Sequence, residues 1–170
     1  MQFQFEIVDS IFGKFFILDS TKGLHFILKN NDERVKNLSK KYKPTKGLFN
    51  KSIITYFKDC TLGNKPSNKL KIKFLNGSHL QKIVWKKLSK ISYGKTISYS
   101  EFAKKTPYPK AIRSIATAVG KNPVSVIVPC HRVIGKDGSI GGYVWGVKMK
   151  TVLLDIECKG MADSTYRGGK

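Results

Sequence analysis

The chain has 170 residues, enough for one ordinary domain or two small ones with a real hydrophobic core. Its 41% hydrophobic and 25% charged content is typical of a globular protein, and no apolar run approaches the ~20 residues of a membrane span. Thirty-two basic residues against eleven acidic ones give a net charge of +21, which favours a polyanionic partner, nucleic acid first.

Lysine supplies nearly all of this positive charge, because the only arginines are Arg34, Arg113, Arg132 and Arg167. Lysine binds phosphate as a point charge, so the composition favours affinity for a nucleic-acid backbone over bidentate reading of bases. A solvated lysine-rich surface is the alternative that composition leaves open. The N-terminus lacks the basic start and apolar run of a signal peptide, so we expect a cytoplasmic protein, or a nuclear one in a eukaryote.

The cysteines and histidines are few and scattered: Cys60, Cys130, Cys158, His25, His79 and His131. No Cys-x-x-Cys pair or Cys/His cluster has the spacing of a zinc site. The sequence therefore predicts no metal site and no cofactor. A disulfide framework is also not expected in a reducing compartment.

Residues 1–75 predict a small α/β domain that serves as a scaffold. Short apolar runs separated by turn residues are typical of antiparallel strands, and Asn31-Asp32 can cap a helix. The predicted elements are strands at 3–8, 15–18 and 24–28, helices ending at residue 40 and spanning 49–57, and a further strand at 70–75. Nothing in this part of the chain is chemically distinctive.

From residue 76 the apolar pattern becomes helical. Ser78 can cap a helix with one apolar face, which Gly94 ends, and Ser98 or Ser100 can cap a short helix. A second short helix is predicted at 111–119, with Pro109 in its first turn. Two short helices joined by a tight turn are typical of a helix-turn-helix.

A last helix is predicted at 147–157, followed by a flexible tail at 159–170. The fold class is therefore α+β, with an N-terminal α/β domain (1–75) and a mainly helical, winged-helix-like C-terminal domain (76–158).

The most informative stretch surrounds Cys130. A β-branched run at 124–128 predicts a buried strand that Pro129 ends, and Cys130, His131 and Arg132 follow directly. A sulfur nucleophile would thus lie beside a group that carries a proton near neutral pH. Neighbours on an extended strand point to opposite faces, so the chain must turn there, or a water must bridge, if His131 serves Cys130. The alternative is an inert, space-filling cysteine.

The string Pro129-Cys130-His131-Arg132-Val133, with Asn122-Pro123 upstream and Gly141-Gly142-Tyr143 downstream, resembles the active-site signature of the O6-alkylguanine-DNA alkyltransferases. These are single-turnover DNA repair proteins. Further matches are Val84-Trp85, Ser92-Tyr93-Gly94, Ser98-Tyr99, Ala111 with Arg113, Trp145-Gly146, and Leu153-Leu154 with Glu157. The resemblance covers residues 77–157 well and the N-terminal half only loosely.

The resemblance implies a role for each matching residue. Cys130 would accept the alkyl group from O6 of guanine, His131 would remove the thiol proton through a water, and Glu157 would orient the imidazole. Asn122 would hold the backbone of the segment. The implied base pocket comprises Tyr99, Val133, Tyr143, Val144 and Trp145, in which Tyr99 hydrogen-bonds the base, Tyr143 forms a wall and Val144-Trp145 make a bulky lip.

The resemblance also implies a partner, double-stranded DNA containing O6-alkylguanine. Arg113 would fill the gap left by the extruded base, and the other implied DNA-binding residues are Ser98, Ala111, Ser114, Ala116 and Thr117. We expect a monomer with no membrane association. The thioether formed on Cys130 has no evident leaving path, so one protein molecule should process one lesion.

Physical chemistry ranks the contributions to such a reaction. A free cysteine of pKa ~8.5 is only a few per cent thiolate at pH 7, and lowering that pKa to about 7 is worth at most roughly 1.6 kcal/mol. An effective molarity near 10⁵ M is worth ~7 kcal/mol. Positioning should therefore outweigh activation. The target oxygen is unreachable inside a stacked duplex, so base flipping follows.

Two other functions remain open from the sequence. A non-catalytic, lesion-recognising helix-turn-helix protein would lack a reactive cysteine, yet Cys130 is present. A cysteine hydrolase with Cys130 and His131 as a dyad would need an acyl substrate and an oxyanion hole, of which the sequence gives no sign.

Overall fold

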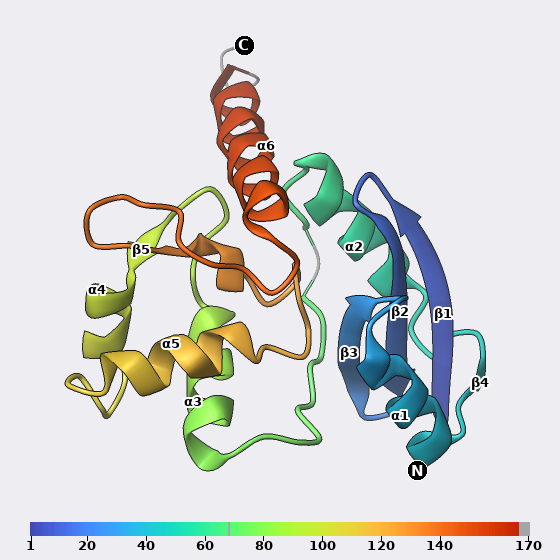
Figure 1. Cartoon of the computed structure of the whole chain (residues 1–170). Coiled ribbons are helices and arrows are strands. Elements are labelled where there is room, and N and C mark those ends of the chain that lie inside the picture. The colour runs from blue at the N-terminus through green and yellow to red at the C-terminus, as the bar shows by residue number, and fades with distance from the viewer. Residues whose placement is uncertain (68, 167–170) are drawn as a thin grey trace.

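The structure, a computed structural model, describes residues 1–67 and 69–166, with side chains through residue 161. Two halves lie side by side (Figure 1): an N-terminal sheet with its helices, and a helical C-terminal half. An extended linker passes between them. The α+β class predicted from the sequence is confirmed.

The sheet of the N-terminal half has the strand order β3-β2-β1-β4. The strands β1 (Phe3–Ser10), β2 (Gly13–Ser20) and β3 (Gly23–Lys29) form the predicted antiparallel meander, and β4 (Thr45–Lys46) pairs parallel with β1. Gly23 begins β3 at a φ of +126°, and a Cβ there would meet the Lys71 carbonyl oxygen at 2.4 Å. Only glycine lets the linker approach this closely.

Two helices accompany the sheet. Helix α1 (Glu33–Tyr42) begins as predicted, with the Asp32 carboxylate accepting from the Arg34 amide. Helix α2 (Ser52–Leu62) starts three residues later than the predicted 49–57. The delay has a physical cause, because the buried Asp19 carboxylate accepts hydrogen bonds from the amides of Phe49 and Asn50 and holds that turn outside the helix.

The strand predicted at 70–75 is wrong. This part of the linker is extended, but it forms only an isolated parallel bridge between Ile72 and Leu24. The Leu24 amide donates to the Lys71 carbonyl at 2.8 Å, and the Lys73 amide donates to the Leu24 carbonyl at 2.9 Å. Alternating apolar residues predicted the extended backbone correctly, but two hydrogen bonds do not make a ladder.

The helices of the C-terminal half begin where their caps predicted. Ser78 and Gln81 form a capping box for α3 (His79–Leu88), and Ser98 and Glu101 form another for α4 (Tyr99–Lys104). Helix α5 (Ile112–Gly120) follows α4 after a short connection, an arrangement that fits a helix-turn-helix. The indole of Trp85 donates to the Ala118 carbonyl at 2.8 Å and ties α3 to α5.

The remaining elements surround Cys130. It opens the single turn of 3₁₀-helix η1 (Cys130–Arg132), which leads into β6 (Val133–Ile134), and β6 pairs parallel with β5 (Ile97–Ser98). The last helix, α6 (Val147–Tyr166), is longer than predicted, so the tail does not begin at residue 159. Residues 167–170 of the predicted tail lie outside the described residues.

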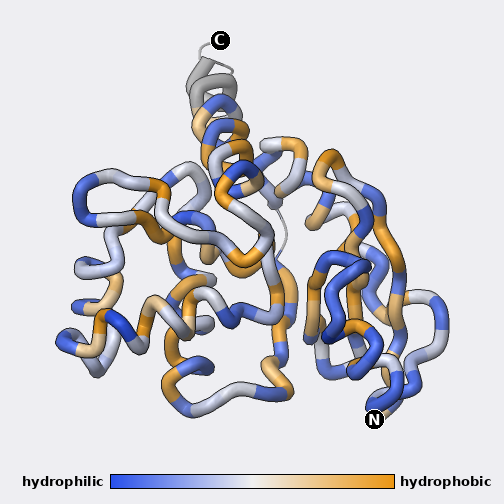
Figure 2. Tube along the Cα trace, viewed as in Figure 1, coloured by the Kyte–Doolittle hydropathy of each residue, from blue (hydrophilic) through white to orange (hydrophobic). Residues whose placement is uncertain are grey.

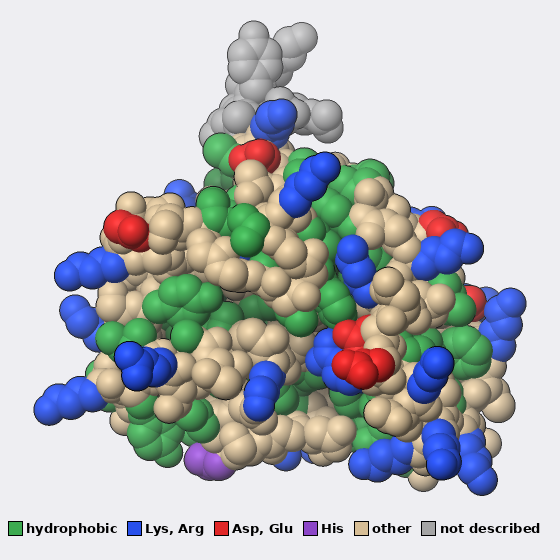
Figure 3. Space-filling view, in the orientation of Figure 1, with side chains coloured by type: hydrophobic (Ala, Val, Ile, Leu, Met, Phe, Trp, Pro, Cys, Tyr) green, Lys and Arg blue, Asp and Glu red, His purple; other side chains and the backbone are tan. Residues whose placement is uncertain are grey.

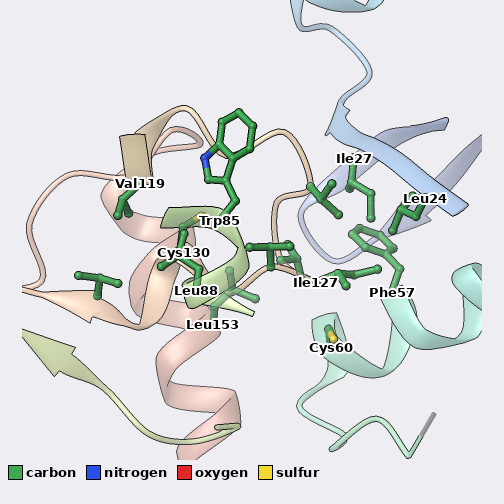
Figure 4. Close-up of a cluster of buried hydrophobic side chains, with 14 of the residues drawn as sticks. Leu24, Ile27, Phe57, Cys60, Trp85, Leu88, Val119, Ile127, Cys130 and Leu153 are labelled. Carbon is green, nitrogen blue, oxygen red and sulfur yellow. The ribbon is translucent and has the colours of Figure 1, made fainter. Parts of the chain in front are cut away.

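One hydrophobic core runs across both halves. Figure 4 shows Leu24, Ile27 and Phe57 of the N-terminal half on one side of Ile127, and Leu88 and Cys130 on the other. Figure 2 shows that apolar residues are present along the chain in both halves. Buried side chains from both sides of residue 75 belong to this one core cluster. Within the described residues, no helix combines the length and apolar character of a bilayer span.

The shared core generates a stability prediction. Phe57 has no exposed surface and packs on Phe15 with ring centroids 5.1 Å apart. We expect Phe57→Ala to lower the free energy of unfolding by about 3–5 kcal/mol in urea titrations. Phe49→Ala, at a side chain that is 39% exposed, should change it by less than about 1 kcal/mol. Equal losses in the two variants would contradict a core that depends on Phe57.

Candidate active site

The segment from Asn122 to Cys130 is a series of tight turns, and the strand predicted at 124–128 is wrong. Its only bridge joins Val124 to Ile27 of β3. The Val128 amide donates to the Val124 carbonyl at 2.9 Å, and the Cys130 amide donates to the Val128 carbonyl at 2.8 Å. A β-branched run normally predicts a strand, but here local turns satisfy backbone groups that a ladder would otherwise pair.

The side chain of Asn122 holds this segment together from inside. Its Nδ2 donates to the Val128 carbonyl at 2.8 Å and to Sγ of Cys130 at 3.2 Å, while its Oδ1 accepts from the Val124 amide at 3.0 Å. Asn122 is itself buried. One amide side chain therefore fixes both ends of the turn and the sulfur atom together.

The turn contains a strained residue. Val126 has a φ of +72°, and the Ile127 amide donates to the Ser125 carbonyl at 2.9 Å around it. This is the rarer form of γ-turn, costing about 1–3 kcal/mol for a residue with a Cβ. Such a conformation persists only where its surroundings over-determine it, as the hydrogen bonds of Asn122 do here.

Cys130 lies at the edge of the core with 3% of its surface exposed. Burial raises the pKa of its thiol, and the hydrogen bond from Asn122 opposes that rise only partly. The resting protein therefore keeps a protonated sulfur in a fixed place.

A buried ionic network lies beside the sulfur. His131 has no exposed surface, and its Nε2 lies 2.9 Å from Oε1 of Glu157 on α6. Arg132 binds the same carboxylate through Nε at 2.9 Å and Nη2 at 2.8 Å, and the Gly94 amide donates to it at 3.3 Å. Burial alone would raise the pKa of Glu157, but the hydrogen bonds from His131 and Arg132 outweigh it and lower the pKa to about 2.

This network sets the tautomer of His131. Since Glu157 is ionised, Nε2 must carry the proton that it shares with the carboxylate. Burial lowers the pKa of His131 despite its acidic partner, so the imidazole is neutral near pH 7. Its Nδ1 is then an unprotonated acceptor, buried and without a protein partner. A free buried lone pair on the residue after Cys130 has the chemistry of a general base.

The tyrosines predicted for the base pocket lie near the sulfur. Burial raises the pKa of Tyr99, and the Cys130 sulfur adds to the rise. The same two causes hold the pKa of Tyr143 well above its usual range, and its hydroxyl is buried without a conventional hydrogen-bond partner. Val133 is buried behind Cys130, whereas Val144 is 38% exposed.

The contacts of Trp145 differ from those predicted for a pocket lip. Its ring packs on Phe15 of β2 with centroids 6.4 Å apart, and the Arg34 guanidinium lies 5.6 Å from its centroid. The side chain therefore joins the loop after Tyr143 to the N-terminal half. The resemblance covers the N-terminal half only loosely and therefore does not predict this contact.

Sequence reasoning also missed two buried cations. The motif around Cys130 predicts no role for Arg132, although Arg132 binds the Glu157 carboxylate through two nitrogens. Lys150 has no exposed surface, and its Nζ donates to the Val133 carbonyl at 2.7 Å. Its position three residues before Leu153 on the buried face of α6 was the available signal.

The residues predicted to bind DNA lie on α5 and at the cap positions that precede α4 and α5. Arg113 is exposed near the start of α5, and the Ser98 side chain caps α4. Along α5, Ser114 and Thr117 are exposed while Ala111 and Ala116 are half-buried. Figure 3 shows Lys and Arg side chains projecting around the edge of one face of the molecule. Among the described residues, no three His, Cys, Asp or Glu side chains gather as a metal-binding group.

Comparisons with known proteins point to one family. Residues 79–159 match the family model described as 6-O-methylguanine DNA methyltransferase, DNA binding domain. An inducible methylated-DNA–protein-cysteine methyltransferase of Bacillus subtilis is 52% identical over 81 residues, which are 48% of this chain and 45% of that protein. The chain thus spans about half the length of this relative, and 56% of a mimivirus relative that is 47% identical.

Other relatives match over nearly the whole chain. The crystal structure of Mycobacterium tuberculosis OGT in complex with DNA superposes with a TM-score of 0.79 at 28% identity, covering 94% of each chain. A methylated-DNA–protein-cysteine methyltransferase of Methanosarcina mazei is 34% identical over 160 residues, covering 90% of this chain and 96% of that protein. On the strength of this full-length match, the chain belongs to the methylated-DNA–protein-cysteine methyltransferase family.

Proposed function

We propose that this protein repairs DNA by transferring an alkyl group, such as methyl, from O6 of guanine to Sγ of Cys130, once per protein molecule. The observation that carries the proposal is the arrangement of three side chains. Asn122 holds the sulfur, and His131, the next residue, is bound through Nε2 to the ionised Glu157. Family membership supplies the substrate class, because the relatives carry the name methylated-DNA–protein-cysteine methyltransferase.

The proton route follows from the tautomer of His131. As Sγ forms its bond to the alkyl carbon, the thiol proton passes through a bridging water to Nδ1, and the imidazolium is stabilised by Glu157. The bond from carbon to O6 breaks, its electron pair stays on the guanine, and the Tyr99 hydroxyl donates to the departing base. Bonds and charges balance without a cofactor.

Positioning supplies most of the rate in this proposal. Burial raises the pKa of Cys130, so the free protein does not hold a preformed thiolate. Instead the sulfur is fixed by Asn122 and the strained turn, and only an alkyl group brought into line with it reacts. This keeps a nucleophile unreactive toward solvent until the substrate arrives.

The DNA contacts are proposed for α5 and for the cap residues that precede α4 and α5. Arg113 is the exposed long cation of α5 among small side chains, so the helix backbone can approach a duplex and the guanidinium can occupy the space of a flipped base. We further propose that the protein acts as a monomer in the cytoplasm, or in the nucleus of a eukaryote. The two alternative functions have no specific observation in their favour.

The first prediction from the proposed function concerns the order of the catalytic contributions. Cys130→Ala should abolish alkyl transfer from methylated-guanine DNA, whereas His131→Ala should slow it by about 10²–10⁴-fold, because the base is lost but the sulfur stays in position. Mass spectrometry of the Cys130 peptide measures the adduct. Cys158→Ser, at an exposed cysteine on α6, is the matched control and should react at the wild-type rate. Complete loss in both site variants would contradict the ranking.

The second prediction concerns pH. The pKa of His131 is lowered, so the neutral base persists below pH 6.5, and the pKa of Cys130 is raised, so the thiol persists above its usual range. The single-turnover rate should therefore be flat from about pH 7 to 8.5 and fall only in acid, as the imidazole takes up a proton. In His131→Ala the rate should instead climb about tenfold per pH unit, as free thiolate forms. A wild-type rate that climbs equally steeply would exclude His131 as the base.

The third prediction concerns base flipping. Arg113→Ala should slow transfer from a lesion within a duplex by about tenfold or more, because unstacking costs a few kcal/mol that the guanidinium offsets. Transfer from the free base O6-methylguanine, which needs no flipping, should be unchanged. Lys36→Ala removes an exposed cation from α1 and serves as the charge control. Equal slowing with duplex and free base would place Arg113 in the chemistry instead of the flipping.

A further inference from the structure

A basic cavity lies between the linker and α3, apart from the proposed DNA-binding residues. Its volume is about 540 Å³, and four lysines surround it, Lys69 and Lys73 on the linker with Lys82 and Lys86 on α3. Tyr56 and Phe74 contribute aromatic wall. We name these six residues the lysine groove. No residue that lines it belongs to α4, α5 or α6.

The groove lies on a face of α3 that the proposed repair function does not use. Val84, Trp85 and Leu88 are buried, and Trp85 binds α5. Lys82 and Lys86 are four residues apart, so they lie one above the other on a different face of the helix. Duplex seated on α5 therefore leaves these two lysines to another ligand.

The charge of the groove is uncompensated. Among the described residues, the ion pairs within 4 Å involve only Asp32 and Glu157 as acids, and none involves a lysine of the groove. Every charged residue that lines the cavity is a lysine. Four like charges around one cavity repel each other, so an anion bound there relieves that repulsion as well as gaining attraction.

The layout of the lysines indicates an extended anion. Four residues of extended linker separate Lys69 from Lys73 by roughly 13 Å. Four residues of helix separate Lys82 from Lys86 by about 6 Å. Two rows of charge facing each other across these lengths suit several phosphates in series better than one compact phosphate.

We propose that the lysine groove binds the backbone of a single-stranded nucleic acid. A cavity of this volume admits one strand and excludes a duplex, which is about 20 Å wide. A basic groove with aromatic walls is the usual site for a single strand, bound without regard to sequence, and lysine suits such binding. The proposal extends the repair function to a second, independent contact with nucleic acid.

The test is fluorescence anisotropy of the full chain with an undamaged, labelled oligothymidine of about twelve nucleotides. The groove variant and its control each replace four lysines by glutamine: K69Q/K73Q/K82Q/K86Q, and K22Q/K36Q/K40Q/K51Q at exposed lysines of the N-terminal half. Both lose the same charge. Circular dichroism and urea unfolding check that each variant is folded.

The groove variant should lose affinity for the oligothymidine far more than the control. Four phosphate contacts to a single strand make the slope of log affinity against log salt concentration more negative by about 3. This slope corresponds to a loss of affinity of about 50-fold between about 50 and 200 mM salt. The groove variant should lose that steepness and the control should keep most of it. After ultraviolet crosslinking, the bound oligothymidine should be attached to the peptides that contain Tyr56 or Phe74.

Three outcomes would overturn the proposal. Equal losses of oligothymidine affinity in the two lysine variants would show that binding depends on net charge and not on the lysine groove. Loss of oligothymidine binding in Arg113→Ala would place the strand on α5, and competition by tripolyphosphate as strong as by unlabelled oligothymidine would make the site one for small anions. The repair function is measured separately by methyl transfer from a short lesion duplex, which the groove variant should perform normally. Absent transfer in the wild type would refute the repair function and leave the groove result intact.

Discussion

The site depends on one buried carboxylate. Glu157 has 2% of its surface exposed, and the hydrogen bonds from His131 and Arg132 keep it ionised there by lowering its pKa, while the Gly94 amide also donates to it. Removing one partner from such a group leaves a buried charge uncompensated. The carboxylate in turn fixes the imidazole and draws together η1, α6 and the loop that follows α3. The proposed catalytic geometry and the stability of the fold therefore rest on the same atoms, which limits the substitutions that this region tolerates.

In the proposed reaction the sulfur of Cys130 is controlled by geometry more than by acidity. The Asn122 amide bonds the sulfur directly, and the backbone on either side of Val126 is forced into a turn that a valine adopts only at a cost. Burial raises the pKa of Cys130 in the same place. A thiol that is hard to ionise and hard to reach is protected from oxidation and from stray electrophiles. For a protein proposed to act once, loss of the sulfur to a side reaction is loss of the molecule.

The sequence predicted local features well and burial of charge poorly. Ser78 and Ser98 each began a helix as expected, because a cap acts over three residues and needs no tertiary context. The β-branched segment 124–128 wrongly predicted a strand. Its backbone groups form hydrogen bonds with the Asn122 side chain and within local turns, which the apolar pattern does not reveal. The burial of Arg132 was not predicted, because charged residues are rarely buried. The Cys130 motif was the exception, carried by its resemblance to known proteins.

The short pairing of β5 with β6 joins the two activities that the protein is proposed to combine. Ser98 ends β5 and caps α4, while β6 begins directly after the turn that carries Cys130. The span between the start of α4 and Cys130 is thus set by main-chain atoms, whose spacing does not vary with side-chain identity. Exposed side chains of α4 and α5 can therefore be replaced without changing the distance from the start of α4 to the sulfur.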